Sequence, residues 1–227
     1  MDQELANLIG AALAFVGSHF ALSHPWRAPL VKRLGAGGFA GFYSLVALIT
    51  LGWMVMAFRA VPHQQMLPWD GSGALPWGLA STLMLAASVL LVGSFRGNPA
   101  LPAPGAAALA PRRPNGVFRI TRHPMMWSFA LWSAAHALVS PSTRVLILTA
   151  TIGFLALAGA MMQDHKKARL MGDNWIMWHR QTSYWPQVME LPKAGLVPWL
   201  SGAALWLGAT WAHGWLIAVP AGLWRWL

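Results

Sequence analysis

The chain has 227 residues, of which 56% are hydrophobic and only 10% are charged. Soluble domains carry about a quarter charged residues, so this composition predicts an integral membrane protein. Because cysteine is absent, disulfides, thiolate nucleophiles and cysteine-ligated metals are excluded. The net charge of +10 would suit nucleic acid, but the basic residues separate apolar segments, where contact with anionic lipid explains them better. We expect membrane lipid, and no nucleic acid, as a partner.

Six apolar stretches reach or approach the roughly 20 residues that a helix needs to cross a bilayer. They predict an all-α fold, a polytopic membrane bundle of about six transmembrane helices in one domain over residues 1–227. The stretches are 5–22, 39–58, 75–95, 124–140, 145–162 and 196–212.

Lysine and arginine are distributed unequally between the connecting segments. Three follow the first stretch, five lie between the third and fourth, and five between the fifth and sixth, so 13 of 16 share one predicted side. Basic loops stay in the cytoplasm, which predicts that both termini are outside and that 96–123 and 163–195 are cytoplasmic loops. Asp2 and Glu4 stand where a cleavable signal would be basic. We expect a multi-pass protein of the cell inner membrane.

Three segments outside the six stretches carry their own predictions. Residues 97–116 are rich in Pro, Ala and Gly and indicate a surface loop. Residues 164–195 begin as an amphipathic helix whose Trp175 and Trp178, with Trp185 beyond them, suit the membrane interface. The sequence at 212–215 predicts the end of the last helix, followed by a short tail on the outer surface over 216–227.

Two histidines fall inside predicted spans, where an ionisable side chain is costly and therefore a candidate for function. His136 lies about 18 Å along its helix from Pro124, with Trp132 and Ser133 on the same face. His19 follows small residues that would let a helix or a flat cofactor approach closely. For both, an imidazole bonded within the helix packing is the alternative. The predicted spans contain no carboxylate, and neutral imidazoles from separate helices suit a transition metal or haem iron.

Arg122 and His123 stand immediately before Pro124, which favours a helix start at that residue. They would then be presented at a helix N-terminus, where anions are favoured. Two interpretations stay open. In one, Arg122 extends to a lipid phosphate; in the other, the pair binds a propionate, phosphate or carboxylate.

Several of these motifs resemble the NnrU family, and within it most closely the zeta-carotene isomerases. The resemblance rests on residues 15–19, the run 35–44, the Arg-Ile-Thr-Arg-His-Pro of 119–124, the Trp-Ser-Ala-Ala-His of 132–136, and residues 180–186. It implies a b-type haem with His19 and His136 as axial ligands. It also implies isomerisation of the central 15-cis double bond that converts 9,15,9'-tri-cis-zeta-carotene to 9,9'-di-cis-zeta-carotene. Ser133 departs from the plant enzymes, which carry cysteine there, so no thiolate ligand is available.

Depth along the helices conflicts with that ligand pair. His19 is close to the basic end of its helix, whereas His136 is 13 residues beyond His123, a mismatch of roughly 10–15 Å. By depth alone His213 suits His136, and His123 suits His19. We therefore keep His19 and His136 from the resemblance, with His213 as the rival ligand.

Two other functional classes remain. The segment 116–124 and the downstream 164–186 resemble membrane methyltransferases of the isoprenylcysteine carboxyl methyltransferase type, which hold S-adenosylmethionine at the cytoplasmic face. The acidic pair of those enzymes is replaced here by residues 163–165, and Met126 replaces an aromatic residue. Alternatively, the resemblance to NnrU implies a haem-bearing accessory or sensor protein in denitrification.

Overall fold

The computed structural model describes residues 2–62, 69–101 and 105–227, and the regular structure over those ranges is entirely helical. The long helices are α1 (Asp2–Ser23), α2 (Arg27–Ala60), α3 (Ala74–Gly93), α5 (Pro124–Val139), α6 (Thr143–Met171) and α8 (Leu196–Ile217). The shorter ones are α4 (Ala106–Leu109), α7 (Asp173–Gln181), η1 (Gly116–Arg119), η2 (Val188–Ala194) and η3 (Gly222–Arg225). The predicted all-α fold is confirmed, and a helix lies at each of the six apolar stretches.

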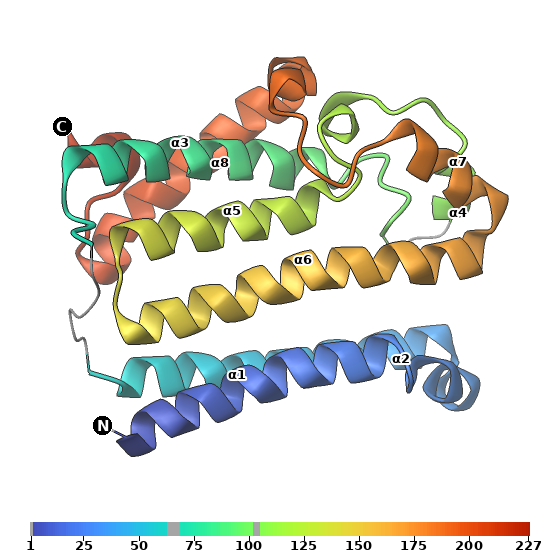
Figure 1. Cartoon of the computed structure of the whole chain (residues 1–227), viewed down its shortest axis with the longest axis horizontal. Helices are drawn as coiled ribbons and strands as arrows, with labels where there is room; N and C mark the ends of the chain where they lie inside the picture. The colour runs from blue at the N-terminus through green and yellow to red at the C-terminus, as the bar shows by residue number, and fades with distance from the viewer. Residues whose placement is uncertain (1, 63–68, 102–104) are drawn as a thin grey trace.

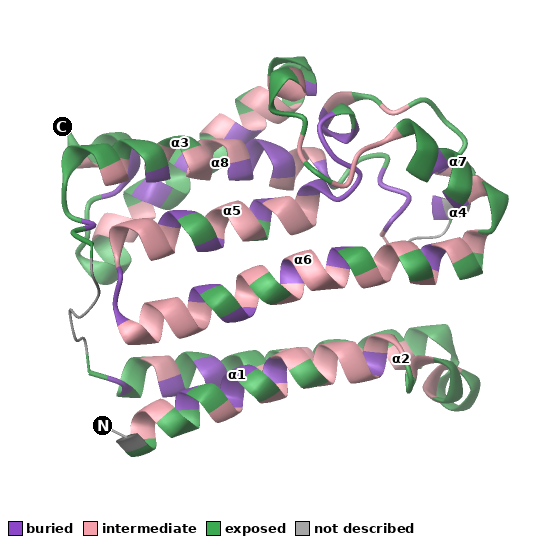
Figure 2. Ribbon diagram, viewed as in Figure 1, coloured by how far each residue is buried: buried purple, intermediate pink, exposed green. Residues whose placement is uncertain are grey.

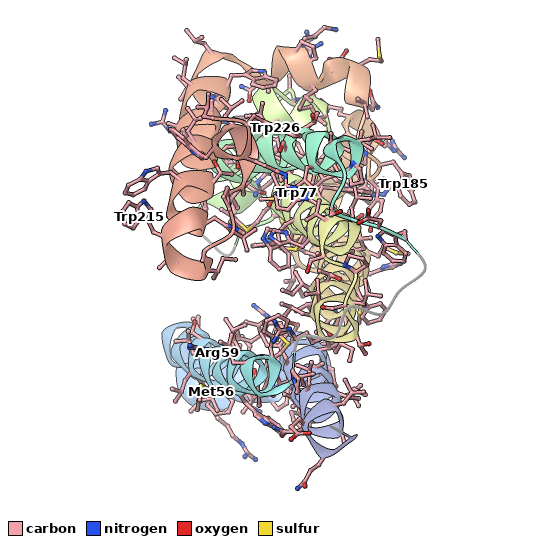
Figure 3. The ribbon with its side chains drawn as sticks, turned by 90° about the vertical axis from the view of Figure 1, so that its left-hand side faces the viewer. Met56, Arg59, Trp77, Trp185, Trp215 and Trp226 are labelled. Carbon is pink, nitrogen blue, oxygen red and sulfur yellow. The ribbon has the colours of Figure 1, made fainter. Side chains whose placement is uncertain are left out.

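The long helices form two parts that meet along α6 (Figure 1). α1 packs against α2 and α6, α6 against α5, α5 against α3, and α3 against α8. We call α1 and α2 the hairpin, and the described remainder from α3 onward the body. Figure 3, which views the molecule from one end, shows the hairpin as a separate layer beneath the body.

Four helices are long and apolar enough to cross a membrane: Gln3–Ser23, Arg27–Ala60, Ala74–Gly93 and Thr143–Met171. α5 has 16 residues and spans about 24 Å, which is short for a bilayer core. α8 is long enough, but its tryptophans, glycines and polar residues lower its hydropathy. The membrane character is therefore supported by four candidate spans, and the expected six stay a prediction.

The two termini lie at the same end of the bundle, where α2 and α5 finish and α6 begins (Figure 1). The opposite half carries the α1–α2 turn, α4, α7, η1 and η2, and with them the segments that hold 13 of the 16 basic residues. The charge bias thus coincides with one end of the molecule. That this end faces the cytoplasm, with the termini outside, stays a prediction.

The buried residues form two hydrophobic clusters, one in each part of the fold (Figure 2). The hairpin cluster centres on Leu8 and Met54, which are fully buried. The body cluster joins α3, η1 and α7 through residues such as Leu90, Phe118 and Trp178. Outward-facing apolar residues are common, as with Met56 and Trp215, which point away from the bundle in Figure 3 and are 67% and 77% exposed. Such a surface suits lipid rather than water.

The structure corrects several boundaries. α2 begins at Arg27, well before the predicted stretch 39–58, and bends at Gly35, whose φ of 71° is a left-handed conformation that glycine adopts without strain. α6 continues past 162 to Met171. α8 runs through the predicted break at 212–215 and ends at Ile217, after which η3 packs back on α8 through the Trp224 indole and the Leu207 carbonyl, 3.1 Å apart.

Two predictions about the basic end are wrong. Trp175 and Trp178 are 1% and 2% exposed and belong to the body cluster, so they cannot lie in the membrane interface, whereas Trp185 is 67% exposed. The segment 97–116 is not simply a surface loop, since Ala100 and Ala110 are buried and Lys167 donates to the carbonyl oxygen of Pro99. Residues 102–104 of that segment lie outside the described residues.

Candidate functional site

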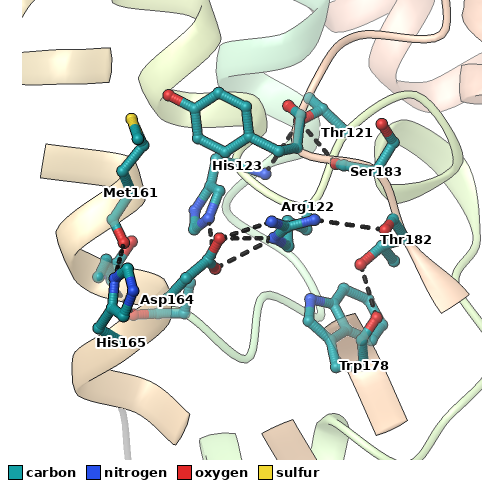
Figure 4. Close-up of polar contacts among 12 residues, drawn as sticks. Thr121, Arg122, His123, Met161, Asp164, His165, Trp178, Thr182 and Ser183 are labelled. Atoms are coloured by element: carbon teal, nitrogen blue, oxygen red, sulfur yellow. Dashed lines mark hydrogen bonds and ion pairs between the residues drawn. The ribbon is translucent and has the colours of Figure 1, made fainter. Parts of the chain in front are cut away.

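A buried ionic network lies where α5 begins (Figure 4). The Arg122 guanidinium donates to both carboxylate oxygens of Asp164 on α6, with Nη2 2.6 Å from Oδ2, and His123 Nε2 lies 2.8 Å from Oδ1. The side chains of Arg122, His123 and Asp164 are 7%, 0% and 13% exposed. Since a carboxylate can only accept, Nε2 of His123 carries a proton, and its Nδ1 is buried without a hydrogen-bond partner.

The backbone around Arg122 is tied to the segment that follows α7. The backbone N–H of Arg122 donates to the carbonyl of Ser183 at 2.8 Å, and Nη1 of its guanidinium donates to the carbonyl of Thr182. Thr121 and Trp127 both donate to the carbonyl of Tyr184. Arg122 is therefore bonded to protein oxygens, and the structure shows a fixed helix start in place of an arginine extended toward lipid phosphate.

Beside this network lies a cavity of about 520 Å³, which we call the membrane-face cavity. Arg122 and Asp164 line it on one side, and aromatic residues of α7 and the following segment line the other. His179, at its edge, has its pKa lowered chiefly by burial, so its neutral form is favoured. The lining residues are Arg122, Met161, Asp164, His165, Ala168, Trp175, Ile176, His179, Arg180, Tyr184 and Trp185.

A second cavity, of about 510 Å³, lies between the hairpin and the body, and we call it the seam cavity. His19 lines it from α1, with Tyr43 of α2 edge-on at 5.5 Å between ring centroids. His19 Nδ1 lies 2.7 Å from the Phe15 carbonyl oxygen, which can only accept. Nδ1 is thus protonated, and in the neutral ring Nε2 keeps the lone pair that a metal ligand needs.

The seam cavity has a polar end and an apolar end. Ser23, His24, Tyr43, Gln163 and Lys166 supply the polar groups, and Nε2 of His24 is buried without a hydrogen-bond partner. The rest of the wall is apolar and comes from α1, α2, α5 and α6. Its apolar lining consists of Phe15, Phe20, Leu51, Met126, Phe129, Ile152, Leu155, Ala156 and Gly159.

His136 lines a third and smaller cavity, of about 160 Å³, between α3, α5 and α8, which we call the end cavity. His213 lines it from α8, and the two imidazole centroids are 6.4 Å apart. Trp132 lies against the His136 ring at 4.2 Å between centroids. Ser133 does not line the end cavity. It is buried and faces Gly153 of α6.

The predicted histidine ligands are therefore divided between sites. His19 lies four residues before the end of α1 and His136 three before the end of α5, and these two helix ends lie at opposite ends of the bundle (Figure 1). They line different cavities and are not brought together, whereas His136 and the rival His213 are. His123 meets Asp164 rather than His19.

The sequence did not predict the places that Asp164, Tyr43 and Met84 take in these sites. Asp164 lies 42 positions from Arg122, so no helical spacing relates them. Tyr43 and Met84 lie in apolar stretches that carry no marker of a site. The sequence marks only Asp164 as unusual, because it is one of only six acidic residues and comes shortly after the apolar stretch 145–162.

Comparison with known proteins gives one match. The family model described as NnrU protein matches residues 7–221, nearly the whole chain. Neither the curated proteins nor the solved structures contain a match.

Proposed function

We propose that this chain, which belongs to the NnrU family, is a membrane enzyme that acts on an elongated apolar substrate in the seam cavity. The observation that carries the proposal is the cavity itself. It combines a volume of about 510 Å³ with mostly apolar walls and two imidazoles, of which His19 has its Nδ1 bonded to a carbonyl and its Nε2 left for a ligand. That volume lies within the roughly 300–1,000 Å³ of small-molecule sites.

The position of the cavity favours a substrate that arrives through the bilayer. α1, α2 and α6, which supply much of its wall, are all candidate membrane spans. The hairpin exposes most of its apolar surface, so a hydrophobic molecule dissolved in lipid can approach without crossing water. The polar end around Ser23, Tyr43 and Lys166 would fix the direction in which such a molecule enters.

Within that class we favour cis-to-trans isomerisation of the central double bond of a carotenoid, the reaction that the resemblance to zeta-carotene isomerases implies. Rotation about a double bond moves no proton, so it can proceed without a general acid or base. The residues that line the seam cavity include no carboxylate, which is consistent with such chemistry. Phe129, Ile152 and Leu155 would hold the polyene and exclude water.

The implied haem b fits one of the two expected histidines. His19 offers a neutral imidazole with an unprotonated Nε2, the form that ligates haem iron, and Lys166 offers a cation for a propionate. His136 does not share this site, and the end cavity, at about 160 Å³, is small for a porphyrin. When bound, haem supplies one-electron exchange that lowers the order of an adjacent double bond. His19 would then hold the haem through its Nε2.

Two variants test this assignment. The His19→Ala protein, purified from haem-replete cells, should lose the haem absorption band, whereas the matched His136→Ala protein should retain it. Co-expression with a pathway that accumulates 9,15,9'-tri-cis-zeta-carotene, followed by pigment analysis, should show conversion by the parent chain and none by the His19 variant. A band that persists without His19 would overturn the ligand assignment. Full haem loading without conversion would instead support an accessory or sensor role.

A methyltransferase is the second candidate, and the membrane-face cavity favours it. Trp175, Tyr184 and Trp185 line that cavity together with Asp164, and aromatic rings and a carboxylate both attract a sulfonium cation such as that of S-adenosylmethionine. Against it, the Asp164 carboxylate is already paired with Arg122. Calorimetric titration with S-adenosylmethionine decides between the candidates. Tight binding by a protein that carries no haem would favour methyl transfer.

A further inference from the structure

We propose that the end cavity is a binding site for monovalent copper, with His136, His213 and Met84 as ligands. The three residues come from α5, α8 and α3 and line the same cavity. The site is distinct from the seam cavity, and the proposal does not depend on what the seam cavity binds. Imidazole nitrogen and thioether sulfur together are a donor set that selects Cu(I).

Both imidazoles are held in the ligand form by backbone carbonyls. His136 Nδ1 lies 2.9 Å from the carbonyl oxygen of Trp132, and His213 Nδ1 lies 2.9 Å from that of Val219. Because a carbonyl only accepts, each Nδ1 carries the proton, and each neutral ring presents an unprotonated Nε2. A hydrogen bond on one ring nitrogen commonly fixes the other nitrogen for a metal.

The separation of the two rings suits one shared ion. A metal bound to two Nε2 atoms at about 2.0 Å each, on a nearly straight line, places the ring centroids about 6 Å apart. The centroids of His136 and His213 are 6.4 Å apart, and their planes are inclined by 56°. Both rings line the cavity of about 160 Å³, which has room for an ion.

The surroundings of the cavity favour a soft, singly charged ion over a divalent one. None of the described residues that line it is a carboxylate, and the Arg225 guanidinium lies 4.0 Å from the ring centroid of Trp77, which also lines it. No group of three or more His, Cys, Asp or Glu side chains gathers within residues 2–62, 69–101 and 105–227, so a conventional zinc or hard-cation cage is not available there. Two imidazoles and a thioether suffice for Cu(I).

The test is a competition titration of Cu(I) on the purified full-length protein in detergent, without oxygen, against a chromophoric Cu(I) chelator such as bicinchoninate. We expect one Cu(I) per chain. His136→Gln and His213→Gln keep a donor for the backbone carbonyl but remove the imidazole lone pair, and each should weaken binding about 100-fold or more. Met84→Leu preserves the apolar volume and should weaken binding about 10-fold.

His165→Gln and Met161→Leu serve as matched controls, since both residues line the membrane-face cavity and neither should change Cu(I) affinity. X-ray absorption of the copper-loaded protein should show nitrogen scatterers and one sulfur scatterer, with the sulfur lost in Met84→Leu. Unchanged affinity in the folded His213→Gln protein, or a copper spectrum without sulfur, would overturn the proposed site. Haem content, followed separately by its absorption band, reports on the seam cavity and should be the same in Met84→Leu as in the parent chain.

Discussion

Replacing Asp164 with asparagine should destabilise the body of the protein strongly. The substitution preserves shape but removes the negative charge that faces Arg122 and His123, whose side chains are 7% and 0% exposed. A guanidinium without a counter-charge would then remain in a largely buried site. Removing one partner of a buried ion pair costs about 3–5 kcal/mol. For a chain of this length each kcal/mol lowers the melting temperature by about 2–4 °C, so the expected loss is about 6–20 °C.

Thermal unfolding in detergent, followed by tryptophan fluorescence, measures this loss. Glu190→Gln is the matched control, because Glu190 pairs with Arg119 and Lys193 at the surface, where ion pairs contribute little. In the double variant Arg122→Met, Asp164→Asn no unpaired charge remains, so it should be more stable than Asp164→Asn alone. A melting temperature for Asp164→Asn within about 2 °C of the parent chain would refute the reasoning, since it falls well short of the shift expected from a buried pair.

Two further predictions concern helix packing and pH. Gly202→Ala would place a Cβ 2.7 Å from the Val89 Cα, which must push α3 away from α8 and lower the free energy of unfolding by about 1–3 kcal/mol. Gly208→Ala on the same helix meets nothing within 4 Å and should be tolerated. Melting curves of the two variants would show the difference. The hydrogen bonds that Lys193 and Arg119 donate lower the pKa of Glu190 below 4.5. The stability that the Glu190 carboxylate adds to the folded protein is therefore present above pH 4.5 and is lost as the pH falls through the lowered pKa. Glu190→Gln should remove that part of the acid dependence, and identical acid transitions in both proteins would contradict it.

The sequence predicted the helices well because membrane-spanning length and continuous apolarity are local properties. Depth along the helices, counted from the sequence, favoured His213 as the neighbour of His136, whereas the resemblance kept His19 in that place; the structure brings His136 near His213. Those two inferences needed no knowledge of how the helices are arranged around one another.

Other features depend on that arrangement and could not be predicted. The pairing of Arg122 with Asp164 joins residues 42 positions apart on different helices. The burial of Trp175 and Trp178 was misread because an amphipathic helix looks the same in sequence whether its apolar face meets lipid or protein. The length of α2 was underestimated because the basic residues at its start resemble a loop, and the bend at Gly35 turns them aside from the main span.

The division of the fold into hairpin and body has a consequence for how the protein unfolds. Each part has its own hydrophobic cluster, and α1 and α6 form the main seam between them. Cooperative units of this kind open with separate free energies, so amide hydrogen exchange should resolve the hairpin from the body as two protection classes.

A molecule bound in the seam cavity would contact both units at once, because the cavity is lined by α1 and α2 on one side and by α5 and α6 on the other. Binding to the folded state alone stabilises that state by mass action. Occupancy of the seam would therefore merge two unfolding events into one, and the cooperativity of unfolding would itself report whether the site is filled.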